Sequence, residues 1–149
     1  MPERINHASI APFEGPYREV LSLLERARTY AKHSVNRHMP PRPANGSHLP
    51  IAVDGLRINC EALRVTTRLS QCLAWLMVQK AIQHGELPPD AARRPENRLD
   101  GEAVCEHEGG EADPGVPEGL RDLLKRSRRI YARVKRLDAG LDRHHKVGH

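Results

Sequence analysis

The feature that most constrains the fold is a long run between Asp54 and His84 whose apolar residues cover most of a helix circumference. At 3.6 residues per turn, these apolar side chains span about 240° around the axis. A helix that packs on a single neighbour needs an apolar stripe of only about 100°. The segment is therefore predicted to be the central helix of a bundle, in contact with at least two partners. Its apolar positions are Leu56, Ile58, Ala62, Leu63, Val65, Leu69, Leu73, Ala74, Leu76, Met77 and Ala81.

Residues at both ends of this run predict a helix over about 52–84. Asp54 is a residue type that caps helix N-termini. Gly85 is suited to the left-handed position after a helix, and two prolines follow it at 88 and 89. The predicted central helix is thus bounded on each side by local signals.

Two further amphipathic helices are predicted, over about 16–33 and 118–138. Pro16 and Pro117 stand where helices commonly open. The fold class that follows is all-α, an antiparallel three-helix bundle over residues 16–139 with a long central helix, flexible loops and a flexible tail. We expect residues 1–15 to form an extended N-terminal arm and residues 140–149 to form the tail.

Residues 86–117 are acidic, contain Gly and Pro, and have few large apolar side chains. Such a segment buries little surface to offset its ordering entropy, so a mobile linker is predicted. Residues 85–117 hold nine acidic and three basic side chains, whereas residues 118–149 hold ten basic and four acidic ones. Because the two regions can attract each other within one chain, the overall charge of +5 is weak support for nucleic-acid binding.

The sequence also argues against several classes of protein. No apolar run reaches the roughly 20 residues of a membrane span, and the first residues lack the apolar stretch of a signal peptide. Cys60, Cys72 and Cys105 are best interpreted as free thiols in a cytoplasmic protein. No nucleotide-binding loop, nucleophile motif or paired metal-ligand motif is present. We therefore expect no enzyme activity, no catalytic residue, no cofactor and no metal.

A polar stripe on the central helix carries the least expected residue, Trp75. Two interpretations remain open from the pattern alone. The indole can pack beneath a long loop, or it can belong to a protein-binding surface, since Trp and Arg provide much of the binding energy at interfaces. The candidate protein-interaction residues are Arg64, Arg68, Gln71, Trp75 and Gln79.

The third helix offers a rival interpretation, because eight Lys and Arg residues fall within 121–136. Such a face can follow phosphates. The sequence lacks an aromatic stacking platform and a helix-turn-helix spacing, so nucleic-acid binding remains the alternative.

The stretch from Leu63 to Ala81, LRVTTRLSQCLAWLMVQKA, followed by Gly85-Glu86, resembles the core motif of the RcdA family. The third helix is similar to that family as well, through Leu120, Leu123, Ser127, Ile130-Tyr131 and the segment 134–138. The match is specific, because Thr-Thr-Arg-Leu and Ala-Trp-Leu contain polar and aromatic residues that bundle packing does not require. The acidic insert at 96–116 and the tail at 143–146 depart from the family pattern.

This resemblance implies a three-helix bundle that self-associates as a homodimer. It implies a non-enzymatic adaptor that tethers protein cargo to the ClpXP protease through a response-regulator-like adaptor, in cell-cycle control. It also implies a cytoplasmic protein that reaches the cell pole through its partners. A basic nucleic-acid-binding protein and a purely structural homodimer remain as alternatives.

Overall fold

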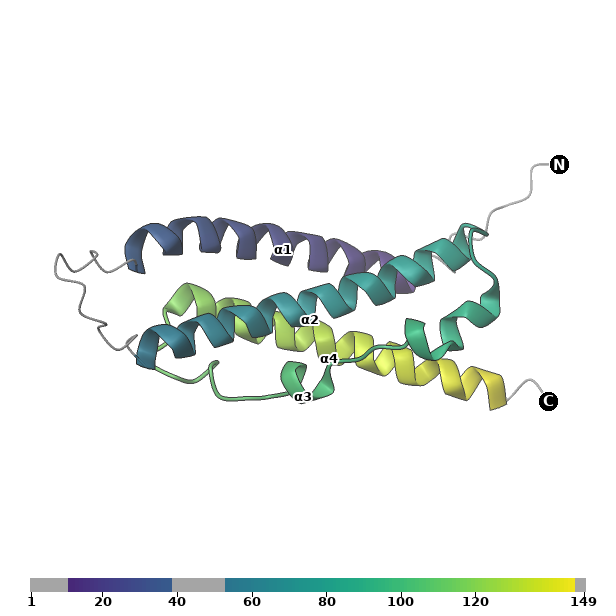
Figure 1. Cartoon of the computed structure of the whole chain (residues 1–149). Coiled ribbons are helices and arrows are strands. Elements are labelled where there is room, and N and C mark those ends of the chain that lie inside the picture. Colours follow the sequence, from purple (N-terminus) through teal and green to yellow (C-terminus); the bar gives the residue numbers. More distant parts are fainter. Residues whose placement is uncertain (1–10, 39–52, 147–149) are drawn as a thin grey trace.

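The computed structural model describes residues 11–38 and 53–146, which form helices and connections without a strand. Three long helices make up the body: α1 (Ala11–His38), α2 (Val53–Gln83) and α4 (Glu118–Lys146) (Figure 1). The connection from α2 to α4 contains two short 3-10 helices, η2 (Pro89–Arg93) and η3 (Pro95–Asn97), and one helical turn, α3 (Glu102–Cys105). The predicted all-α fold with three long helices is confirmed.

The three long helices do not alternate in direction. α1 runs antiparallel to both other helices, whereas α2 and α4 run parallel (Figure 1). Contacts between side chains agree with this arrangement. Trp75, late in α2, binds Asp138, late in α4, while Phe13 at the start of α1 packs against the same indole. The up-down-up order of a simple antiparallel bundle is therefore not what this chain adopts.

Parallel packing of α2 and α4 explains the length of the connection between them. Because α2 ends at the far end of the bundle, residues 84–117 must return along its whole length before α4 can begin (Figure 1). A short loop can join only antiparallel neighbours, so a parallel pair needs a long crossover. We call residues 84–117 the crossover. It contains three short helices and packs against α2 and α4, although the sequence predicted a segment that buries little surface. Its mobility stays a prediction.

Helix boundaries also differ from the predicted ones. α1 begins at Ala11, so Pro16 lies inside the helix and is buried instead of opening it. α4 continues to Lys146, so most of the predicted tail is helical. Residues 1–10, 39–52 and 147–149, which hold the rest of the predicted arm and tail and most of the connection between the first two predicted helices, lie outside the described residues. The end of α2 is as predicted, with Gly85 at φ +75° after the last turn.

The core is built from aliphatic side chains of the three long helices, closed at one end by aromatic rings. Phe13 and Trp75 meet edge to face with ring centroids 5.7 Å apart. The buried aliphatic residues include Val20, Leu23, Val65, Leu69, Leu76, Leu120, Leu124, Ile130 and Val134.

Within the described residues, no helix combines the length and the apolar character that crossing a membrane requires.

Candidate protein-interaction surfaces

Arg68 lies in the centre of the polar stripe on α2, and its side chain is fully buried. Its guanidinium group donates hydrogen bonds to groups on both the crossover and α4, including the carboxylate of Glu111 at 3.3 Å. A planar group with five N–H donors can satisfy such a divergent set of acceptors, whereas a lysine cannot. The other acceptors are the carbonyl oxygens of Cys105 (2.7 Å), Leu124 (2.9 Å) and His107 (3.0 Å) and the hydroxyl of Ser127 (3.3 Å).

The pKa values of Arg68 and Glu111 depend on burial and on the contact between the two side chains. Burial lowers the pKa of Arg68 below its ordinary value, and the Glu111 carboxylate acts in the opposite direction. Burial alone would raise the pKa of Glu111, but backbone N–H groups at Glu111 and Gly109 and the Arg68 guanidinium outweigh it, so this pKa is lowered. The two side chains therefore form an ion pair at neutral pH that fixes the crossover to α2.

Arg64 and Gln71 fix the same crossover on either side of Arg68. Arg64 donates to both carboxylate oxygens of Glu61, at 2.9 and 2.8 Å, and to the carbonyl of Val104 at 3.1 Å. The amide oxygen of Gln71 accepts the N–H of Asp100 at 3.4 Å. The crossover therefore packs on the polar stripe of α2.

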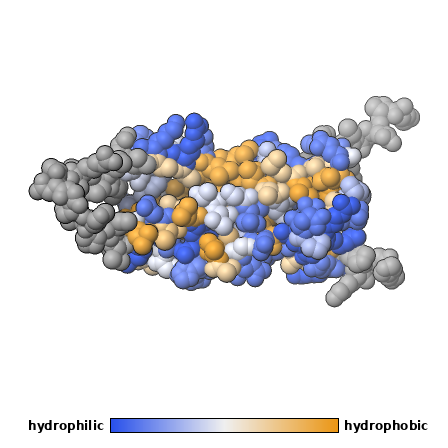
Figure 2. Space-filling model, in the orientation of Figure 1, coloured by the Kyte–Doolittle hydropathy of each residue, from blue (hydrophilic) through white to orange (hydrophobic). Residues whose placement is uncertain are grey.

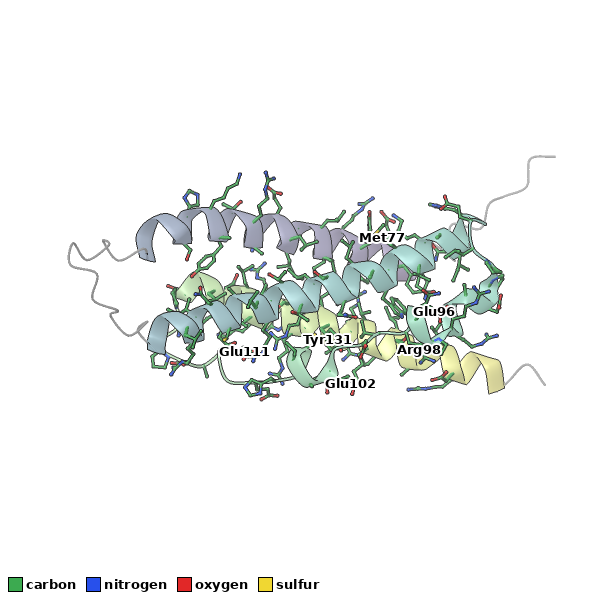
Figure 3. The ribbon with its side chains drawn as sticks, in the orientation of Figure 1. Met77, Glu96, Arg98, Glu102, Glu111 and Tyr131 are labelled. Carbon is green, nitrogen blue, oxygen red and sulfur yellow. The ribbon has the colours of Figure 1, made fainter. Side chains whose placement is uncertain are left out.

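Trp75 is only 2% exposed, and its indole N–H donates to Asp138 of α4 at 2.8 Å. The same carboxylate accepts hydrogen bonds from Arg98 at 2.9 Å and from the N–H of Leu99 at 3.4 Å. Asp138 therefore joins α2, α4 and the crossover. Figure 3 shows Arg98, Glu102 and Glu111 along the crossover, with Tyr131 of α4 among them.

All five candidate residues predicted from sequence are thus at least half-buried. Gln79 is 5% exposed, and its amide nitrogen has no hydrogen-bond partner among the described residues. The stripe is not an open surface in this structure, and Trp75 packs as its first interpretation proposed, beside the crossover. A direct contact of these five side chains with a partner stays a prediction, and it requires the crossover to move.

α2 also exposes large apolar residues. Leu63, Leu56 and Met77 are 65%, 57% and 56% exposed, although the sequence predicted them to pack inside the bundle. They belong to a set that repeats with alternating spacings of three and four residues, the spacing of a coiled-coil seam. We call this set the α2 seam: Leu56, Cys60, Leu63, Thr67, Ser70, Ala74, Met77 and Ala81.

None of the eight seam residues is charged, in a chain of which 29% of residues are charged. Apolar and near-neutral residues lie along the course of α2 on the face that Figure 2 shows. Met77 lies on the opposite edge of α2 from Arg98 and Glu111 (Figure 3). Contiguous exposed surface of this kind marks interaction sites on soluble proteins.

The seam was not predicted, because every apolar residue of α2 was expected to lie in the core. The missed signal was the absence of charge along this arc, since a solvated helix face ordinarily carries charged residues. Two threonines of α2 donate to carbonyl groups one turn earlier in the helix: Thr66 to that of Ala62 at 3.2 Å, and Thr67 to that of Leu63 at 2.9 Å.

The three thiols differ sharply in exposure, which gives a first prediction. Cys60 is exposed on the seam, whereas Cys72 and Cys105 are fully buried, and burial raises the pKa of Cys72 to about 12. Because the thiolate is the reactive form, we expect the folded chain at neutral pH to take up maleimide at Cys60 and not at Cys72 or Cys105, and a partner bound to the seam should slow the labelling of Cys60. Peptide mapping by mass spectrometry would check the site. Rapid labelling of all three thiols without denaturant would contradict the packing described.

The predicted attraction between the crossover and the third helix is present in the structure. Arg128 of α4 pairs with Glu108, and Lys135 pairs with Glu106 and, at 3.5 Å, with Glu102. Arg57 of α2 pairs with Asp113 farther along. Acidic residues of the crossover thus neutralise one flank of α4.

Comparisons with known proteins agree with this architecture. The crystal structure of RcdA from Caulobacter crescentus CB15 matches with 31% sequence identity and a TM-score of 0.56, over 85% of this chain and 87% of that one. No curated protein matches the chain. The resemblance to the RcdA family that the sequence motif indicated is confirmed. Because the family described as "Protein of unknown function (DUF1465)" matches residues 6–148, the chain belongs to that family.

Proposed function

We propose that this protein is a non-enzymatic adaptor that tethers protein cargo to the ClpXP protease in cell-cycle control. The observation that carries the proposal is the α2 seam, an exposed and uncharged helix face with no partner in the described part of the chain. The similarity to RcdA supports the same assignment. The adaptor meets the protease through a response-regulator-like adaptor, in the cytoplasm and at the cell pole.

Such an adaptor needs only to bind its partners. Tethering raises the effective concentration of cargo at the protease, and each contact needs only modest affinity when two are linked. The polar residues at the centre of this fold, Arg68 and Asp138 among them, are engaged in holding the crossover. The described structure therefore offers contact surfaces on a rigid frame.

We assign the seam to a homodimer contact. A repeat with three- and four-residue spacing suits packing against another helix of the same pattern, which a second copy supplies by symmetry. Its small central residues, Thr67, Ser70 and Ala74, permit close approach, while Leu56, Leu63 and Met77 provide apolar area nearer the ends. Dimerisation would leave the outer face of α4 available for other partners.

Replacing two seam residues tests both parts of the proposal. We expect Leu63→Glu with Met77→Glu to yield monomers, because pairing would bury four like charges. Equilibrium sedimentation measures the association state. In a degradation assay with primed ClpXP and a cell-cycle cargo, the variant should lose most of the acceleration that the parent protein gives.

Leu21→Glu is the matched control, since Leu21 is 42% exposed on α1 and lies outside the seam. This variant should remain dimeric and active. Unchanged association of the double variant would remove the seam from the dimer. A parent protein that accelerates degradation of no cell-cycle cargo would refute the adaptor role, whatever its association state.

A further inference from the structure

The outer flank of α4 carries five basic residues for which the structure gives no ion pair among the described residues. They follow one another every three or four positions, so they lie on one side of the helix. Four are exposed and Arg121 is half-buried. We call this set the α4 basic stripe: Arg121, Lys125, Arg129, Arg133 and Arg136.

The opposite flank of α4 shows what kind of segment binds such residues. There the acidic crossover runs beside the helix and pairs Glu102, Glu106 and Glu108 with Arg128 and Lys135. That stretch exposes Val104 and buries little apolar surface apart from Cys105. In addition to the hydrogen bonds from Arg64 and Arg68 of α2, acidic side chains of this stretch pair with α4, and the basic stripe offers the same kind of pairing on the other flank.

We propose that the α4 basic stripe binds an acidic peptide segment of a partner protein, with carboxylates spaced about one helical turn apart. The inference deepens the proposed adaptor function, on which it rests for the biological role of the partner. The stripe is about 22 Å long, since it spans fifteen residue steps of 1.5 Å each. It is one helix face wide, and ion pairs border it on both sides: Arg128 with Glu108 toward the crossover, and Arg26 with Asp122 toward α1.

These borders favour a peptide over nucleic acid. A duplex is wider than the stripe and would bring its phosphates near Glu108 and Asp122, whose carboxylates would repel them. A single strand would fit the width, but single-strand binders stack bases on aromatic rings. Tyr131 is the one aromatic residue of α4, and it is buried, with its hydroxyl donating to the carbonyl of Asp100 at 2.9 Å.

The test uses the full chain and a fluorescein-labelled helical peptide that has Glu at every third or fourth position, followed by fluorescence anisotropy. We expect binding that weakens steeply with salt and no binding of the peptide with Gln in place of Glu. Arg129→Glu with Arg133→Glu should weaken binding about tenfold or more, because like charges would then face each other. The control Lys32→Glu with Arg93→Glu makes the same change in net charge on exposed residues of α1 and η2 and should bind as the parent does.

Circular dichroism would establish that both variants remain helical. Equal weakening in the two variants would overturn the proposal, because overall charge and not the stripe would then control binding. Absence of peptide binding would overturn it as well. Tighter binding of single-stranded DNA of matched length, lost in the stripe variant alone, would replace the peptide with nucleic acid. None of these readouts uses the protease, so peptide binding without accelerated degradation would retain the stripe and refute only the adaptor role.

Discussion

Arg68→Ala is expected to destabilise the protein by about 3–5 kcal/mol, the usual cost of removing one partner of a buried ion pair. The substitution leaves the Glu111 carboxylate and the carbonyl oxygens of Cys105, Leu124 and His107 without their shared donor. Most of these acceptors are partly or wholly shielded from water, so solvent replaces the lost bonds poorly. Urea unfolding followed by circular dichroism would measure the change.

The region that Arg68→Ala destabilises first is as informative as the loss of stability itself. Since Arg68 joins the crossover to α2 and α4, hydrogen exchange should rise first in residues 101–111, before the long helices open. Arg68→Lys should recover only part of the stability, because an ammonium group cannot reach acceptors in so many directions. Arg129→Ala on the basic stripe should change stability by no more than about 0.5 kcal/mol. An Arg68→Ala variant as stable as the parent would contradict the burial described.

Sequence patterns predicted the long helices because periodicity reports which residues share a face. The amphipathic helix predicted after Pro117 and the terminator at Gly85 are both present in the structure. The direction of α4 could not be predicted in this way. A helix has the same periodicity whichever way it points. Only the length of the connection, which is sufficient for a return along the bundle, indicated that α2 and α4 could lie parallel. Because the composition of residues 86–117 is typical of disordered segments, the length of this connection was not interpreted as a return along the bundle.

The polar stripe was misjudged for a related reason. Arg68 on a helix face is ordinarily solvated, and its burial depends on carbonyl oxygens that the crossover brings from about forty residues away. Backbone carbonyls have no sequence signature, so no pattern on α2 could reveal them. The excess of acidic residues in the crossover and of basic residues in α4 did predict attraction between the two regions, and Arg128 with Glu108 is one of the resulting pairs.

Trp75→Ala is expected to cost about 3–5 kcal/mol in stability, as large-to-small replacements of buried aromatic residues do. The indole is 2% exposed, packs edge to face on Phe13 and donates to Asp138. Removing it leaves a cavity where α1, α2 and α4 meet, and it takes one donor from the carboxylate that also holds Arg98. Thermal unfolding by circular dichroism would show a single transition at a much lower temperature.

Trp75→Phe separates the two contributions. It retains most of the ring volume and loses the indole N–H, so about 1 kcal/mol is expected, the ordinary contribution of one hydrogen bond. Below its unfolding transition, Trp75→Ala should retain both the dimer and the acidic-peptide contact, since neither the seam nor the basic stripe includes Trp75. If this variant instead kept the stability of the parent and lost cargo delivery, the indole would be a contact residue, and the crossover would have to open when a partner binds. Hydrogen exchange in residues 98–111, measured with and without the partner, would then show whether the crossover moves.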